Sequence, residues 1–117
     1  MSDTPPTFRL SEPEDFEITV GDSGTVVSVR GELDMLTAPL LWERLEPLLP
    51  SIEDRLVIDL AGARFIDSMG LGVLVRVHKR LRGQKDKDAG IVVRAPSEQT
   101  RKLLEMTGLH RVFAIED

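Results

Sequence analysis

The chain has 117 residues, of which 41% are hydrophobic and 30% are charged, as expected of one small globular domain. It has no cysteine, which excludes disulfides, thiolate catalysis and cysteine metal sites and fits a reducing cytoplasm. With a net charge of −5, four Phe and one Trp, the chain is not expected to bind nucleic acid. It shows no signal peptide, and no apolar run approaches the ~20 residues of a membrane span.

The N-terminal part is predicted to contain an arm and a hairpin. Residues 1–13 are polar and include three prolines, which predicts a loosely held arm with a candidate edge strand at Thr7–Leu10. The globular domain is predicted to span residues 14–117. Apolar and polar residues alternate over residues 16–20, and a second β-rich segment spans residues 25–30 after a turn rich in glycine. This pattern predicts a β-hairpin.

A first helix is predicted after Gly31–Asp34. Thr37 is its candidate N-cap, and Pro39 fits the first turn, where its missing N–H would have no partner. Four leucines are predicted to form its buried stripe: Leu41, Leu45, Leu48 and Leu49. The helix is predicted to end at Pro50. Trp42 lies off the stripe and has two interpretations, a partly exposed contact residue or a ring packed under the N-terminal arm.

A buried strand is predicted in the middle of the chain, followed by a second helix. Leu56–Leu60 is apolar and β-branched, and Ala61–Arg64 is predicted to turn the chain before Phe65 and Ile66 return to the core. Beyond these residues, apolar positions recur every three or four residues and so share one helix face, namely Leu71, Leu74, Val75, His78 and Leu81.

Ser68 is predicted to open this second helix. Its hydroxyl can cap a free backbone N–H, and the same helix start favours negative charge. Gly70 and Gly72 each cost about 1 kcal/mol of helix propensity relative to alanine. Their presence predicts the close approach of another backbone segment.

The last third is predicted to contain a charged loop, a strand, a helix and a final strand, at Gly83–Gly90, Ile91–Arg94, Ser97–Gly108 and Val112–Ile115. Ser97 is the candidate N-cap of this helix, and Gly108 is expected to end it in the left-handed conformation. Its apolar side is predicted to consist of Leu103, Leu104 and Met106. Alternating strands and helices predict a single α/β domain with a mixed sheet, because the N-terminal hairpin adds an antiparallel pair to parallel strands.

The segment at residues 65–75 reads Phe-Ile-Asp-Ser-Met-Gly-Leu-Gly-Val-Leu-Val. It closely resembles the phosphorylation-site motif of STAS-domain proteins of the anti-sigma factor antagonist type. The resemblance extends to Gly31–Asp34 and Leu103–Leu109, and it covers most of the chain from about Phe16. It implies a STAS-like fold in which Ser68 is phosphorylated. Met69 stands where that family more often has a small polar residue, which predicts a change of partner more than of switch chemistry.

The resemblance places a site around Ser68. Asp34, Asp67 and Gly70 are expected to shape the pocket of the phosphorylation site. Five residues are expected to contact the partner: Glu32, Thr37, Met69, Leu71 and Gly72. Some alternatives stay open: Asp67 either orients the hydroxyl or caps the helix, Glu32 is equally a solvated acid, and capping explains Thr37 more simply than modification. A phosphate adds nearly two negative charges, which a helix start is expected to tolerate while a bound partner is repelled.

The residues favour a binding protein over an enzyme. The segment around Ser68 lacks the first glycine of a Gly-x-Ser-x-Gly nucleophile elbow, and His78 lies too far along the helix to be its base. His78 is predicted to be a histidine at the edge of the core. No metal or cofactor is expected, because the two histidines are separated and no phosphate-binding loop occurs. The basic run Arg76–Lys87 is either the solvated face of a helix and its loop or a docking surface for an acidic partner.

The leading hypothesis is a cytoplasmic anti-sigma factor antagonist, which binds an anti-sigma factor and frees a sigma factor. The resemblance implies that the anti-sigma factor is also a serine kinase, that phosphorylation of Ser68 ends the interaction, and that a phosphatase resets it. The alternative hypothesis is a STAS scaffold subunit of a transporter or of a stress-sensing complex. The chain is expected to be a monomer or weak dimer.

Overall fold

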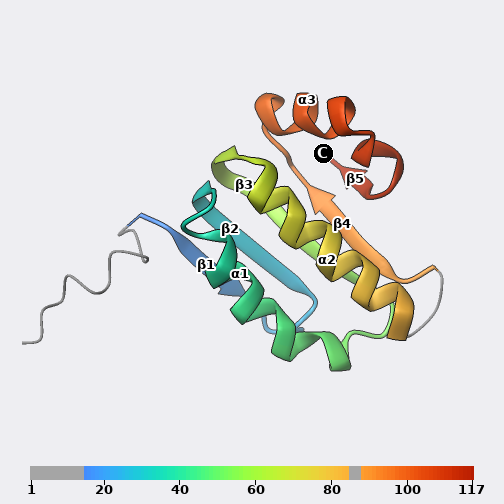
Figure 1. The fold of residues 1–117 in the computed structure, drawn as a ribbon. Coiled ribbons are helices and arrows are strands. Elements are labelled where there is room, and N and C mark those ends of the chain that lie inside the picture. Colours follow the sequence, from blue (N-terminus) through green and yellow to red (C-terminus); the bar gives the residue numbers. More distant parts are fainter. Residues whose placement is uncertain (1–14, 85–87) are drawn as a thin grey trace, which may run out of the picture.

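The structure is a computed structural model that describes residues 15–84 and 88–117 (Figure 1). The predicted arm at residues 1–13 lies outside the described residues. Five strands form one sheet in the order β1-β2-β3-β4-β5, so each strand lies beside its neighbours in sequence. Within the described ranges, none of the helices has both the length and the apolar character needed to cross a membrane.

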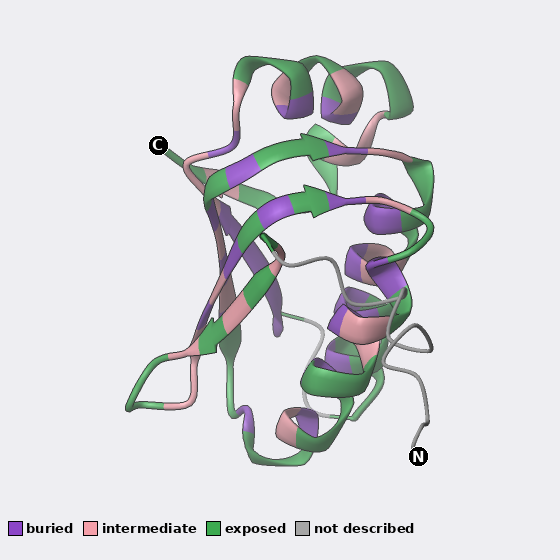
Figure 2. Cartoon of the chain, turned by 90° about the vertical axis from the view of Figure 1, so that its left-hand side faces the viewer, coloured by how far each residue is buried: buried purple, intermediate pink, exposed green. Residues whose placement is uncertain are grey.

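The first two strands form the predicted hairpin. β1 (Glu17–Val20) and β2 (Val26–Leu33) pair antiparallel. The turn between them contains Gly24 at a φ of +76°, a conformation that glycine adopts without steric cost. Fully buried residues alternate with more exposed ones along β2, because one face of the sheet packs on helices and the other is more open to solvent (Figure 2).

β3 (Arg55–Ile66) is one continuous strand of 12 residues, so the predicted turn at Ala61–Arg64 is wrong. β3 runs parallel to β2 along nearly its whole length, and the register between them shifts twice near Gly31. These irregularities let both strands bend together, so the small residues that suggested a turn remain in the sheet. A Cβ at Gly62 would lie 3.2 Å from Cγ of Arg30 on the neighbouring strand, so glycine relieves a tight contact there.

β4 (Gly90–Arg94) and β5 (Ala114–Glu116) extend the sheet in parallel. The final strand was expected to begin at Val112, and this start is wrong. Leu109–Arg111 forms the short 3₁₀-helix η3, and its first carbonyl accepts hydrogen bonds from the N–H groups of Val112 and Phe113. Phe113 therefore turns into the core, where it is 3% exposed, before β5 begins.

Helices α1 (Ala38–Leu45) and α2 (Ser68–Gln84) lie side by side over one face of the sheet (Figures 1 and 2). α1 is shorter than predicted, because the chain passes into the 3₁₀-helix η2 (Glu46–Ser51) at Pro47, which has no N–H to continue the α-helix. The buried residues of α2 are Gly70, Leu71, Leu74, Val77, His78 and Leu81. Val77 is thus a core residue that the predicted stripe omitted, and His78 is buried at the core edge as predicted.

α3 (Glu98–Thr107) begins and ends as the sequence predicts. Oγ of Ser97 accepts a hydrogen bond from the N–H of Thr100 at 3.1 Å. Gly108 follows the last turn with a φ of +77°. Both ends of this helix are therefore set by local side-chain and backbone preferences.

α3 lies across one end of the sheet and holds the end of β3 (Figure 1). The side-chain amide of Gln99 donates to the carbonyl of Ile66 at 3.1 Å and accepts from the N–H of the same residue at 3.3 Å. Leu104 packs into the core, whereas Met106 is 82% exposed, so its predicted place on the apolar side is wrong. Two residues separate these side chains by about 200° around the helix.

Candidate functional site

The candidate site lies where β2 and β3 end and α1 and α2 begin. The N–H of Asp67 donates to the carbonyl of Leu33 at 3.1 Å, which joins the two strand ends. A Cβ at Gly70 would lie 2.7 Å from Cγ and 2.8 Å from the carbonyl oxygen of Leu33. The close approach predicted from the glycines is therefore confirmed for Gly70. At Gly72 it is wrong, because no described atom beyond its own helix lies within 4 Å of the Cβ position.

Asp67 caps α2. Its Oδ1 accepts hydrogen bonds from the N–H groups of Met69 at 2.9 Å and Gly70 at 3.0 Å. Its carbonyl also accepts the first helical hydrogen bond, from Leu71 at 3.0 Å. A carboxylate at this position complements the helix dipole as well as the free N–H groups. The capping interpretation of Asp67 thus describes the structure, and the predicted cap at Ser68 is wrong.

Ser68 is the first residue of α2 and is exposed. Its hydroxyl makes no hydrogen bond to any residue in the described part of the chain. Asp67 already accepts hydrogen bonds from the N–H groups of Met69 and Gly70, so the Ser68 hydroxyl is not needed to cap the helix. Oγ is therefore accessible from solvent.

Thr37 lies in the connection between β2 and α1, where its side chain makes hydrogen bonds to the backbone. Its hydroxyl donates to the carbonyl of Glu32 at 2.7 Å and accepts from the N–H of Asp34 at 2.9 Å. Oδ1 of Asp34 in turn accepts from the N–H groups of Leu36 at 3.0 Å and Thr37 at 3.2 Å. Thr37 stands at the N-cap position of α1 but makes no capping hydrogen bond from its side chain, so the predicted cap is wrong.

Three of the expected site residues do not present their side chains as predicted. Thr37 is 1% exposed and Leu71 is 3% exposed, so neither side chain is accessible at the surface where a contact with the partner was expected. Both side chains are instead buried beneath the exposed residues of the site. The carboxylate of Asp34 is used within its own loop and makes no hydrogen bond to Ser68 in the described residues.

Glu32 lies at the edge of the site, where its side chain is exposed. Nη2 of Arg64 lies 3.9 Å from its carboxylate and 2.5 Å from that of Asp15. The hydrogen bond from Arg64 holds the pKa of Asp15 below its ordinary value. These three side chains are more than half exposed, so solvent screens them and they contribute little to stability.

Large apolar side chains are exposed on the same two connections and at the end of β3. They are Met35 at 66%, Leu36 at 52%, Phe65 at 41% and Met69 at 54% exposed. Only Met69 was expected at the surface. The sequence signal for two of the others was a pair of adjacent large apolar residues directly after Asp34. Exposed apolar groups that gather in one region indicate a contact surface for another protein.

A groove of about 400 Å³ runs between α1 and α2 beside Ser68. Its walls come from both helices: Ala38, Pro39, Trp42 and Glu43 from α1, and Ser68, Met69, Gly72, Val73 and Arg76 from α2. The groove stays open at Gly72, which has no side chain to fill it. The guanidinium of Arg76 lies 3.9 Å from the ring centroid of Trp42, a cation–π contact that holds the ring in the groove wall.

Comparisons with known proteins agree with this architecture. The family model described as "Mlab, STAS domain" matches residues 17–115. The anti-sigma-F factor antagonist RsfB of Mycobacterium tuberculosis is 32% identical over 108 residues, which cover 91% of this chain and 85% of the relative. The anti-sigma-B factor antagonist of Staphylococcus aureus is 34% identical over 101 residues, or 86% of this chain and 91% of the relative.

Among solved structures, the crystal structure of an anti-sigma factor antagonist from Mycobacterium paratuberculosis superposes with a TM-score of 0.75 at 34% identity. The superposition covers 92% of this chain and 90% of that chain. The family match and the relatives together confirm the resemblance that the motif around Ser68 suggested. The chain belongs to the STAS-domain family.

Proposed function

We propose that this protein is a cytoplasmic anti-sigma factor antagonist, which binds an anti-sigma factor and so frees the sigma factor. The two named relatives above 30% identity and the solved structure at 34% identity are all antagonists of this kind. They favour this function over that of a transporter or stress-complex scaffold. The observation that carries the proposal is Ser68, an exposed hydroxyl without a structural task beside an open apolar groove.

The partner surface consists of this groove and the exposed apolar residues around it. Met69 projects at the mouth of the groove, and Met35 and Leu36 extend the apolar surface onto the connection before α1. Methionine side chains adapt to the shape of a partner, which suits a protein that binds and releases. Trp42 adds a large, amphipathic ring of the type that often dominates interface energetics.

Phosphorylation of Ser68 ends the interaction by charge. The expectation that the helix start satisfies the phosphate needs correction, because Asp67 already accepts the N–H groups of Met69 and Gly70. The phosphate therefore stays in solvent, next to another carboxylate and in front of the groove. A partner packed there must desolvate nearly two negative charges. A loss of about 3 kcal/mol weakens binding more than a hundredfold.

The kinase is the anti-sigma factor itself in this proposal, and a separate phosphatase restores the free hydroxyl. Incubation of the protein with its cognate kinase and ATP should add one phosphate, which mass spectrometry should map to Ser68. Thr37 and Ser97 serve as internal controls, because both hydroxyls are engaged in hydrogen bonds at the start of a helix. Phosphate on either control residue instead of Ser68 would refute this site.

Titration calorimetry with the anti-sigma factor then tests the mechanism. Ser68→Ala should bind like the unmodified protein and should not respond to the kinase. The phosphorylated protein should bind more than a hundredfold more weakly, and Ser68→Asp should lose part of this affinity, since a carboxylate carries less charge than a phosphate. Equal affinity of the modified and unmodified proteins would contradict the proposal.

A further inference from the structure

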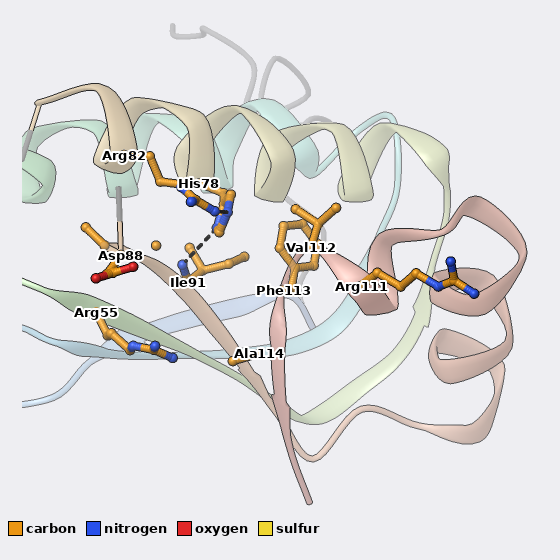
Figure 3. A pocket seen from close by; sticks show the side chains of 11 residues that line it. Arg55, His78, Arg82, Asp88, Ile91, Arg111, Val112, Phe113 and Ala114 are labelled. Atoms are coloured by element: carbon orange, nitrogen blue, oxygen red, sulfur yellow. Dashed lines mark hydrogen bonds between the residues drawn. The ribbon is translucent and has the colours of Figure 1, made fainter. Parts of the chain in front are cut away.

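A second cavity lies along the same helix, beside its C-terminal half and remote from the Ser68 site (Figure 3). It measures about 320 Å³ and lies between α2, the starts of β3 and β4, and the segment after η3. Three arginines line it, namely Arg55, Arg82 and Arg111, and the one acidic residue in its described lining is Asp88. Figure 3 shows Arg82 beside His78, with Asp88 drawn between this pair and Arg55, while Arg111 points away.

His78 is held rigidly in the cavity wall and is 6% exposed. Its Nδ1 accepts a hydrogen bond from the N–H of Ile91 at 3.1 Å, drawn as a dashed line in Figure 3. The ring meets the edge of Phe113 at a centroid distance of 5.4 Å. Gly90 provides the space for it, since a side chain there would collide with the imidazole.

The surroundings of His78 also determine its protonation state and which ring nitrogen carries the proton. Burial, and next the charge of Arg82, hold the pKa of the imidazole below its ordinary value of 6.5, so the ring is neutral at pH 7. Because Nδ1 accepts from Ile91, the single ring proton is assigned to Nε2.

Nε2 therefore acts as a donor, and it lies 3.4 Å from Nη1 of Arg82, which is also a donor. This contact is no hydrogen bond, because neither nitrogen offers the other an acceptor. Two donors, one of them on a side chain that is more than nine-tenths buried, converge on the cavity without an acceptor from the described residues between them. A buried donor is normally satisfied, so Nε2 of His78 indicates an acceptor that the described residues do not supply.

We propose that the cavity binds a small tetrahedral oxyanion of the phosphate or sulfate type. One oxygen accepts from Nε2 of His78 and Nη1 of Arg82, and Arg55, which also lines the cavity, adds positive charge that offsets the Asp88 carboxylate. Guanidinium groups suit such oxygens because their N–H groups form charge-assisted hydrogen bonds. The volume exceeds that of one oxyanion, so the same chemistry fits inorganic phosphate with water or the phosphate group of a larger molecule.

Nuclear magnetic resonance tests this proposal with inorganic phosphate as the probe, at an ionic strength held constant with sodium chloride. The Ile91 amide and the His78 Nε2 signal should shift and saturate. Arg82→Gln and Arg55→Gln should each weaken binding about tenfold, the effect of losing one charge-assisted hydrogen bond. Lys79→Gln removes the same charge from an exposed position on α2 outside the cavity, and its affinity should match that of the unaltered protein.

Two outcomes overturn the proposal. One is a linear drift that sodium chloride alone reproduces. The other is equal weakening by Lys79→Gln and Arg82→Gln, which would indicate general charge attraction. A parallel titration with glycerol phosphate distinguishes the two sources of the oxyanion: tighter binding than that of inorganic phosphate assigns the cavity to an organic phosphate, and weaker binding assigns it to the free ion.

Discussion

The connections before α1 and before α2 have a common plan, in which a strand end is followed by an aspartate and then by a hydroxyl residue at the helix start. In the first, Asp34 and Thr37 hold each other in a partly buried network of hydrogen bonds. In the second, Asp67 alone caps the helix and Ser68 is left exposed. A hydroxyl at a helix start thus becomes available for regulation when a neighbouring side chain takes over its structural role.

Spacing along the chain explains this difference. Thr37 follows Asp34 by three residues, so the chain can fold back and bring the hydroxyl against the strand end. Ser68 follows Asp67 directly and starts the helix itself, with its side chain toward solvent. Variants that remove one side chain from either connection test this difference. They show whether the Thr37 hydroxyl stabilises the fold and whether the Ser68 hydroxyl does not.

The largest loss of stability is expected at Gly70, where the two connections touch. Gly70→Ala places a Cβ 2.7 Å from Leu33 and should cost about 3 kcal/mol through overpacking. Gly72→Ala, the matched control two residues further along α2, meets open space and should gain up to about 1 kcal/mol of helix propensity. Urea unfolding measures both values, and an unchanged stability of Gly70→Ala would show that the contact is not tight.

A smaller loss is expected at Thr37. Thr37→Val keeps the shape of the side chain but leaves the N–H of Asp34 and the carbonyl of Glu32 without this partner, at a cost of about 2 kcal/mol. Ser68→Ala should change the free energy of unfolding by less than about 0.5 kcal/mol. Similar losses for the two variants in a denaturant titration would contradict the contrast between the two hydroxyls.

Asp67 should show a moderate effect that depends on the replacement. Asp67→Ala removes the cap and should cost about 1 kcal/mol, whereas Asp67→Asn keeps an acceptor and should stay within a few tenths of the unaltered protein. In a kinase assay, the same Asn variant distinguishes two roles of Asp67: capping of α2 and orientation of the Ser68 hydroxyl for phosphorylation. We expect Ser68 of Asp67→Asn to be phosphorylated at the normal rate, and a marked decrease at unchanged stability would assign the carboxylate a role in the transfer.

The smallest change in stability is expected for Met69→Glu, within about 0.5 kcal/mol, because the side chain is exposed. Binding to the anti-sigma factor should nevertheless weaken at least about tenfold as a charge enters the apolar surface. Met106→Glu on α3 introduces the same change at another exposed methionine and should alter neither quantity. A collapse of the thermal midpoint of Met69→Glu would make this residue part of the core.

Local patterns predicted much of the fold. The hairpin follows from alternation around a glycine turn, and both ends of α3 follow from Ser97 and Gly108. Pairing overrode the pattern at Ala61–Arg64, where small residues suggest a turn but β2 alongside keeps them in a strand. α1 ends early because Pro47, unlike Pro50, lies inside the predicted helix and interrupts its hydrogen bonds.

The site was predictable in part. The motif identified Ser68, but no local rule decides between two adjacent capping candidates, and the choice of Asp67 depends on how the end of β3 meets Leu33. The groove arises from packing of α1 on α2, so neither helix shows it alone. Trp42 was noted as a contact candidate, while its partner Arg76 was visible only once the two helices were placed side by side.

The order of the strands also bears on how the chain is made. Each strand pairs with the one synthesised just before it, so every new strand meets a partner that has already left the ribosome. All elements of the Ser68 surface precede β4 in the chain, from β2 to the first turns of α2. Synthesis therefore delivers the residues of this surface early, and later translation adds β4, α3 and β5, including Gln99, which hydrogen-bonds the end of β3.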